Sequence, residues 1–151
     1  MSKINKRQER HVRLYHELLD SAAYLALTCP ARCLLVELLK LYNGKNNGHI
    51  ALGMREAAER LGCNKDTVPY RFDELRAKGL IRLATPGWFS SKGRHASEWI
   101  ITCADYDGEP ATRDYLTWQG QDFEIPTRQP KASGWAKRKP KLRVVPQGPA
   151  A

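Results

Sequence analysis

The stretch Met54–Leu83, MREAAERLGCNKDTVPYRFDELRAKGLIRL, predicts two short helices, a tight turn and the start of a strand. Apolar side chains recur at helical spacing in each half of it, at Ala57, Ala58 and Leu61 and again at Val68, Phe72 and Leu75. Gly62 can adopt the positive φ that ends a helix, and Asn64 can cap the next one. Lys78 and Gly79 then predict the end of the second helix. Residues 54–78 are therefore expected to form a helix-turn-helix.

The residues before this stretch predict further helices and one short strand. Glu17–Leu27 has the spacing of one or two short helices. Thr28 offers a cap for a longer helix with Pro30 in its first turn, followed by a leucine-rich stripe. Residues 43–48 are turn formers, and residues 49–52 are expected to form a small strand. His11–Tyr15 alternates well enough to enter the fold as an extended segment.

The residues after the second helix predict a long hairpin. Leu80–Ala84 and Trp99–Thr102 are β-rich, and Pro-Gly and Lys-Gly turn signals lie between them. Residues 80–102 are therefore expected to form a two-stranded wing with a long basic tip. A three-stranded sheet would then close one side of a three-helix core. The expected fold is mainly α with a small antiparallel β-sheet, a winged helix-turn-helix with flexible N-terminal and C-terminal extensions.

Charge is distributed unevenly along the 151 residues, which carry a net charge of +9. Residues 1–10 are polar and expected to be disordered, residues 11–118 are expected to form the domain, and residues 119–151 a flexible basic tail. A short amphipathic piece at Asp114–Trp118 is expected to pack back on the domain. Residues 127–151 contain seven Lys and Arg and no acid, whereas residues 103–126 are acidic. This balance favours a polyanionic partner, although solubility alone explains a moderate positive charge.

Several function classes have little support in the sequence. The four cysteines, Cys29, Cys33, Cys63 and Cys103, match no zinc spacing or close disulfide framework, and partly buried reduced thiols are expected. No phosphate-binding loop, nucleophile elbow or paired metal ligands occur, so we expect no enzyme, metal or cofactor. No apolar run suits a membrane or a secretion signal, which predicts a cytoplasmic, nucleoid-associated protein without an evident small-molecule ligand.

The second helix of a helix-turn-helix enters the major groove by its N-terminal half. The candidate DNA contacts are its polar residues that face away from Val68 and Phe72, namely Asn64, Lys65, Thr67, Tyr70 and Arg71. A merely solvated polar face would look similar. Asp66 is explained by the helix dipole, with cytosine recognition as the alternative. Pro69 lies five residues beyond Asn64, so the first turn is expected to be irregular or to start later.

The wing and the tail supply further candidate contacts. Short or cationic side chains in the wing suit phosphate oxygens or a narrow minor groove, namely Ser90, Ser91, Lys92, Arg94 and His95. Trp88 and Phe89 could stack on sugars or bases, but core packing is favoured for them and for Trp99. Cations of the tail would add nonspecific affinity or serve only as a solvated extension, namely Lys137, Arg138, Lys139, Lys141 and Arg143.

REAAERLGCNKDTV, RFDELRAKGLI and HASEWIIT resemble bacterial winged helix-turn-helix DNA-binding domains over residues 54–102. PARCLLVELLKLYNGKNNGHIALGMREAAERLG, RHASEWIIT and GEPATRDYLTW look like small proteins of bacterial prophages and mobile elements, over residues 11–118. The fold and DNA binding are what this resemblance implies. The chain departs from the winged-helix pattern at Pro69, where that family usually has a small residue. This departure weakens the inference of base contacts from the family more than it weakens the inference of the fold.

The expected function is sequence-specific binding of double-stranded DNA by a transcriptional regulator, with a homodimer as a possible state. One alternative is an accessory protein for plasmid or phage replication initiation or excision, because the chain has no evident effector domain. Another is a winged-helix module that binds RNA or protein. A promoter footprint would favour a regulator, binding of an origin fragment and a partner pull-down would favour the accessory protein, and preference for RNA over duplex DNA would favour the third alternative.

Overall fold

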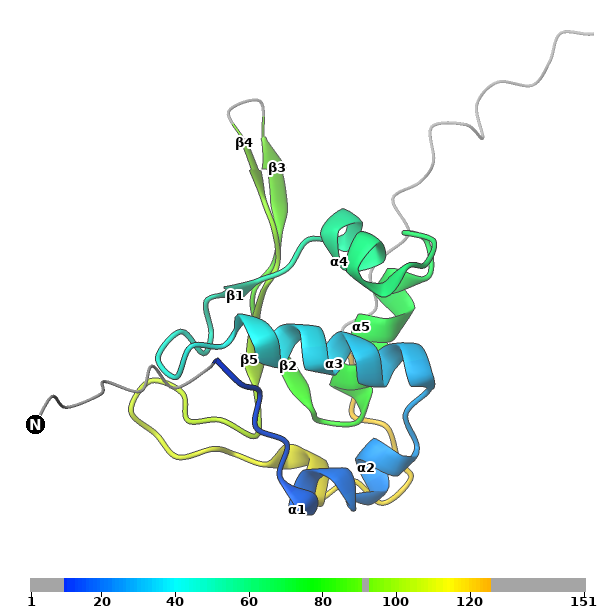
Figure 1. The fold of residues 1–151 in the computed structure, drawn as a ribbon, viewed down its shortest axis with the longest axis vertical. Coiled ribbons are helices and arrows are strands. Elements are labelled where there is room, and N and C mark those ends of the chain that lie inside the picture. Colours follow the sequence, from blue (N-terminus) through cyan, green and yellow to red (C-terminus); the bar gives the residue numbers. More distant parts are fainter. Residues whose placement is uncertain (1–9, 91–92, 126–151) are drawn as a thin grey trace, which may run out of the picture.

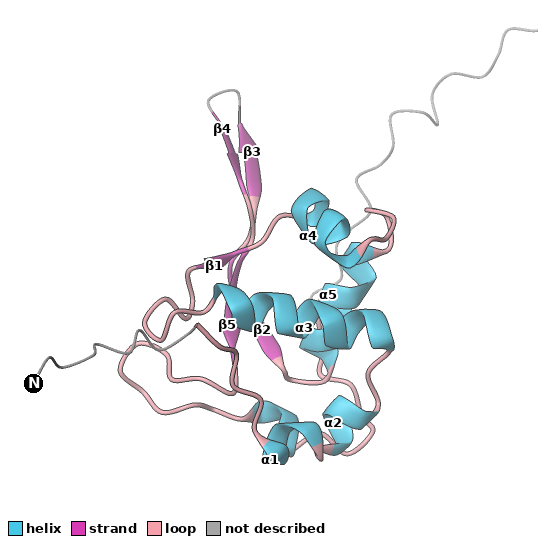
Figure 2. Ribbon diagram, in the orientation of Figure 1, coloured by secondary structure: helices cyan, strands magenta, loops and turns pink. Residues whose placement is uncertain are grey.

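The computed structural model of the chain describes residues 10–90 and 93–125. These residues combine five α-helices with a three-stranded antiparallel sheet, a separate two-stranded ribbon and one 3₁₀ turn (Figures 1 and 2). The predicted combination of helices with a small antiparallel sheet is confirmed. In chain order the elements are α1 (His16–Leu19), α2 (Ala22–Leu25), α3 (Cys29–Leu41), β1 (Ile50–Ala51), α4 (Met54–Leu61), α5 (Val68–Ala77), β2 (Ile81–Thr85), β3 (Trp88–Ser90), β4 (Gly93–His95), β5 (Glu98–Ile101) and η1 (Asp114–Leu116).

The first three helices follow the sequence pattern closely. Residues 11–15 run without strand pairing before α1. The hydroxyl oxygen of Ser21 accepts a hydrogen bond from the backbone N–H of Tyr24 at 3.2 Å, which caps α2. Helix α3 starts after Thr28 with Pro30 in its first turn, where the missing N–H is harmless. Its buried stripe forms the centre of the core, at Ala31, Leu34, Leu35, Leu38 and Leu39.

Helices α4 and α5 are joined by a turn at residues 62–67. Gly62 ends α4 in the left-handed region, with φ of 62°, as the sequence predicts. Asn64 does not cap the next helix, because α5 begins at Val68 with Thr67 as its N-cap residue, and the later start expected from Pro69 is confirmed. Pro69 is the physical reason. It occupies the first turn of α5, where a proline fits, and a helix started at Asn64 would put it in the interior.

The central strand of the three-stranded sheet is β5, with β1 and β2 on either side. Trp99 of β5 pairs with Ile50 of β1 and Leu83 of β2. Its side chain is buried, and its ring stacks on Phe72 of α5 with centroids 4.4 Å apart. The expectation that Trp99 belongs to the core is therefore confirmed, and this stack joins the sheet to α5.

The ribbon of β3 and β4 projects away from the rest of the domain (Figure 1). At its base, the backbone N–H of Gly87 donates to the hydroxyl of Ser97 at 3.0 Å. A Cβ atom at Gly87 would lie 2.8 Å from both the carbonyl oxygen of His95 and the backbone nitrogen of Ser97. Only glycine therefore permits this close approach between the segment at Gly87 and the segment at residues 95–97, and the ribbon extends from this point.

Residues after β5 return to the helical side of the domain, next to α2. Tyr115 of η1 is buried, and Arg82 Nε donates to Asp114 Oδ2 at 2.6 Å. The expected packing of residues 114–118 against the domain is confirmed. The contact continues past Trp118, since the backbone N–H of Phe123 donates to Ala77 at 2.7 Å. Of the predicted N-terminal extension at residues 1–10 and the predicted tail at residues 119–151, residues 1–9 and 126–151 lie outside the described residues. Within the described residues, no helix has the length and apolar character to cross a membrane.

Candidate nucleic-acid interface

An open hollow of about 510 Å³ lies between the turn before α5, the start of α4 and the ribbon. Three cations line it, Arg55 from α4, Lys65 from the turn and Arg94 from β4. Asp66 is the one acid among its lining residues, and Met54 and Pro69 contribute apolar surface. Segments far apart in the sequence thus bring three positive side chains and one negative side chain to the same concave surface. Such a surface attracts a polyanion.

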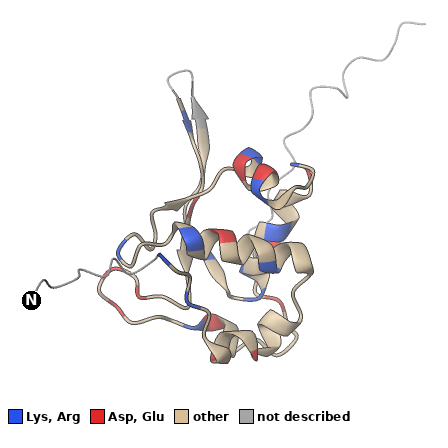
Figure 3. Cartoon of the chain, in the orientation of Figure 1, with Lys and Arg blue, Asp and Glu red and all other residues tan. Residues whose placement is uncertain are grey.

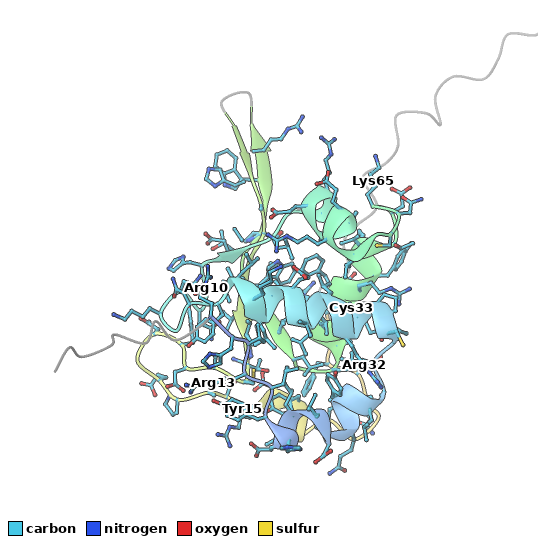
Figure 4. The ribbon with its side chains drawn as sticks, in the orientation of Figure 1. Arg10, Arg13, Tyr15, Arg32, Cys33 and Lys65 are labelled. Carbon is cyan, nitrogen blue, oxygen red and sulfur yellow. The ribbon has the colours of Figure 1, made fainter. Side chains whose placement is uncertain are left out.

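The predicted contacts on the turn and in the first turn of α5 divide into two groups. Asn64 and Thr67 are used inside the turn, because Asn64 Oδ1 accepts from the Asp66 N–H at 3.1 Å and the Thr67 hydroxyl donates to the Asn64 carbonyl at 2.7 Å. Lys65 and Tyr70 are exposed, and no described residue makes a hydrogen bond or ion pair with either side chain. Figure 4 shows Lys65 directed outward beyond α4. Asn64 and Thr67 therefore shape the turn that presents Lys65.

The predicted contact Arg71 lies on the flank of α5 that faces α3. Its Nη1 atom is 3.0 Å from Glu74 Oε2 and 3.1 Å from the hydroxyl of Thr28. Glu74 also accepts from the backbone N–H of Thr28 at 2.7 Å and from its hydroxyl at 2.8 Å. The carboxylate thus takes the place of a cap at the start of α3. Arg71, Glu74 and Thr28 form a polar lock between α3 and α5.

The pKa of Glu74 reflects this environment. Partial burial alone would raise the pKa, but the hydrogen bonds from the N–H and hydroxyl of Thr28 and from Arg71 prevail and lower it. The charged carboxylate is therefore the form that the lock favours. The sequence suggested that Arg71 contacts DNA, whereas in the structure its guanidinium is bonded to Glu74 and Thr28.

Helix α4 has two cations on opposite flanks of its apolar stripe. Arg60 pairs with Glu37 of α3 at 2.9 Å and with Glu56 at 2.7 Å, and these hydrogen bonds raise its pKa. Arg55 lies on the other flank and lines the hollow. The sequence reasoning missed Arg55. A helical wheel at 100° per residue does give a signal, because it places Arg55 about 110° from the centre of the apolar stripe. Arg60 lies at about the same angle on the other side, so the wheel does not tell which of the two arginines faces a neighbouring helix.

The ribbon places its predicted residues on two faces. Arg94 lines the hollow, whereas the neighbouring His95 lies opposite Trp88 and stacks on it with centroids 4.5 Å apart. The expectation that Trp88 packs in the core is wrong, because its side chain is 51% exposed. The strand that carries Trp88 extends beyond the sheet, so no helix covers it. Among the other residues of the predicted wing, Ser90 ends β3, the side chains of Phe89 and Ser90 are not described, and Ser91 and Lys92 lie outside the described residues.

The acidic part of the chain lies apart from the hollow. Asp105, Asp107 and Glu109 belong to the loop after β5, on the side of the domain opposite α4 and α5 (Figure 3). The predicted tail cations, at Lys137, Arg138, Lys139, Lys141 and Arg143, lie outside the described residues. The described domain therefore presents a positive concave surface at α4, α5 and the ribbon, and a negative loop elsewhere.

The cysteine side chains differ from the sequence expectation. Cys29 and Cys33 are exposed on α3, and only Cys63 and Cys103 are partly buried. The reason is that α3 directs Leu34 and Leu38 into the core, which leaves the other face of the helix in solvent. Burial raises the pKa of the Cys103 thiol. In the part of the chain that the structure describes, no three His, Cys, Asp or Glu residues gather as a metal site.

No family model matches the chain, and neither the curated proteins nor the solved structures contain a match to it.

Proposed function

We propose that this chain is a winged-helix protein that binds double-stranded DNA in a sequence-specific manner and acts as a transcriptional regulator. The observation that carries the proposal is the concave surface where Arg55, Lys65 and Arg94 converge beside the exposed start of α5. The resemblance to bacterial mobile-element proteins in residues 11–118 supports the winged-helix fold and DNA binding.

In the proposed complex, the start of α5 faces the major groove. Tyr70 is 70% exposed on the side of α5 opposite its buried stripe, so its ring and hydroxyl are available to base edges or a phosphate. Lys65 precedes α5 and reaches the phosphate backbone. Arg55 and Arg94 neutralise phosphates on either side of the hollow. The backbone N–H groups at the start of α5 add partial positive charge in the same place.

Arg71 has a positioning role in this proposal. Its guanidinium is held by Glu74 and Thr28, so it fixes the angle between α3 and α5 rather than reading a base. Asp66 has a different role, because its carboxylate repels phosphates and accepts hydrogen bonds from exocyclic amino groups of bases. The cations would thus supply most of the affinity, and Asp66 and Tyr70 would contribute to the choice of sequence.

The test is a fluorescence-anisotropy titration of the full chain with duplex DNA over a series of salt concentrations. Random-pool selection of bound duplexes supplies the target sequence. We expect binding that weakens steeply with salt, and a logarithmic salt slope that falls by about 1 for each phosphate-contacting cation removed. Lys65→Ala and Arg55→Ala should each show this loss.

The matched control is Lys45→Ala, because Lys45 is an exposed lysine in the loop between α3 and β1 and does not line the hollow. Its salt slope should equal that of the unchanged protein. Absence of duplex binding at low salt would refute the proposal. Equal losses from Lys45→Ala and Lys65→Ala would show that the hollow is not the binding surface.

A further inference from the structure

The stacked pair of Trp88 and His95 presents an aromatic surface that the proposed duplex contact does not use. Both side chains are exposed, the rings are nearly parallel at 16°, and their centroids lie 4.5 Å apart. We propose that this pair is a stacking site for an unpaired base of DNA next to the bound duplex. The inference rests on the proposed DNA-binding function and adds the class of DNA that the ribbon recognises.

The exposure of Trp88 is not required by the packing of the domain. Trp99 already fills the core position of the sheet and is only 1% exposed. The base of the ribbon is fixed by the close approach at Gly87 and by its hydrogen bond to Ser97, neither of which involves the indole of Trp88. A cross-strand stack with His95 steadies the ribbon, but half of the tryptophan surface still faces solvent.

The register of the ribbon separates this aromatic surface from the hollow. Trp88 pairs with His95, and successive side chains of a strand point to opposite faces. Arg94, next to His95, lines the hollow. The aromatic pair therefore lies on the face of the ribbon directed away from α4 and α5. In the proposed complex, a duplex in the hollow contacts the face of the ribbon that carries Arg94. The opposite face, which carries Trp88, would contact the DNA that continues past the end of this duplex.

The chemistry of the aromatic surface selects the kind of DNA. Bases within a duplex cover one another's faces, so a protein ring can stack on an unpaired base but not on a base inside the duplex. Any of the four bases can occupy such a site, because each has a π-face. The loss of one protein–base stack reduces affinity by about 5- to 150-fold. A junction between duplex and single-stranded DNA fits both faces of the ribbon at once.

The experiment compares three DNA ligands that share one duplex and differ at one end. The first is blunt, the second has a six-nucleotide single-stranded overhang, and the third has an overhang of equal length built from abasic residues. Anisotropy titrations use the full chain at one salt concentration. We expect the base-containing overhang to bind about 5- to 150-fold more tightly than the abasic one, and the difference reports base stacking because both carry the same phosphates. The abasic overhang is expected to bind close to the blunt duplex.

The variants locate the effect on the ribbon. Trp88→Ala should remove the preference for overhang bases and leave blunt-duplex affinity unchanged, whereas Trp88→Phe should retain part of the preference. Tyr106→Ala is the control, because Tyr106 is an exposed aromatic on the loop after β5, and it should change neither ligand. Thermal unfolding of each variant verifies that the domain is folded.

Two outcomes overturn the inference. One is equal affinity of the unchanged protein for base-containing and abasic overhangs, which would mean that phosphate charge explains any gain. The other is an equal loss on blunt and overhang ligands in Trp88→Ala, which would place the indole against the duplex. Failure of blunt-duplex binding together with a preserved preference for overhang bases would refute the proposed duplex function and leave the stacking site supported.

Discussion

Replacing Glu74 by alanine should destabilise the domain by about 2 kcal/mol, because Glu74 serves two helices at once. Its side chain is only 14% exposed and accepts from the N–H and hydroxyl of Thr28 and from Arg71, at 2.7, 2.8 and 3.0 Å. Loss of a helix cap costs about 1 kcal/mol. The remaining hydrogen bond and the partly exposed ion pair together contribute about 1 kcal/mol more, since the freed donors of Thr28 and Arg71 regain water.

The assay is thermal unfolding followed by circular dichroism, with a urea titration for the free energy. A loss of this size corresponds to a fall in Tm of roughly 8 °C, at about 4 °C per kcal/mol for a domain of this length. Glu56→Ala is the matched control, because Glu56 also pairs with an arginine, Arg60, on a helix surface but is 52% exposed. That variant should lose only about 0.3–0.5 kcal/mol. Equal losses in the two variants would refute the assignment of a lock to Glu74.

The pH dependence provides a second check on the same carboxylate. Burial raises the pKa of Glu74, but its hydrogen bonds from Thr28 and Arg71 bring it below the ordinary 4.5. A lowered folded-state pKa means that the stabilisation is fully present above pH 4.5 and is lost as pH falls through the folded-state value. The difference in unfolding free energy between the unchanged protein and Glu74→Gln should therefore shrink below pH 4.5. A difference that stays constant through this range would contradict the lowered pKa.

Two further predictions concern the backbone turns. Gly62 and Gly79 both have positive φ, of 62° and 71°, but a Cβ at Gly62 would meet open space whereas one at Gly79 would lie 2.7 Å from the ring of Phe123. Gly62→Ala should cost about 1 kcal/mol and Gly79→Ala at least about 2 kcal/mol by urea unfolding, and equal costs would contradict the packing of Phe123. Asn47 is buried, its amide nitrogen donates to three backbone carbonyls, and its Oδ1 accepts from Ile101 at 2.7 Å. Asn47→Asp replaces the donor by a charge facing those carbonyls and should cost about 3 kcal/mol above pH 5; an unfolding curve like that of the unchanged protein would refute this network.

Much of the fold could be predicted because the relevant signals are local. The spacing of leucines in α3 fixes one apolar face whatever the rest of the chain does, and Gly62 and Gly79 mark helix ends through their own backbone freedom. The start of α5 was also encoded locally, by Pro69, although the capping potential of Asn64 pointed to an earlier start. Asn64 uses its side chain to shape the turn instead.

The candidate site was less predictable because it depends on which flank of a helix meets which neighbour. Arg55 and Arg60 lie at similar angles on opposite sides of the apolar stripe of α4, so the sequence does not distinguish them. The packing of α4 against α3 pairs Arg60 with Glu37 and leaves Arg55 in the hollow. Similarly, Arg71 could face DNA or another helix. Its contact with Thr28 joins residues 43 positions apart, which no local pattern reports.

The two tryptophans of the wing region illustrate the same division. The sequence by itself determined that Trp99 lies in an extended segment and placed Trp88 in the tip between the two β-rich runs, because β-propensity and turn residues act over a few positions. Tertiary structure decided that Trp99 is covered by Phe72 and that Trp88 is exposed beside His95. The physical reason is that burial depends on what lies across from a strand, and α5 reaches β5 but not the ribbon.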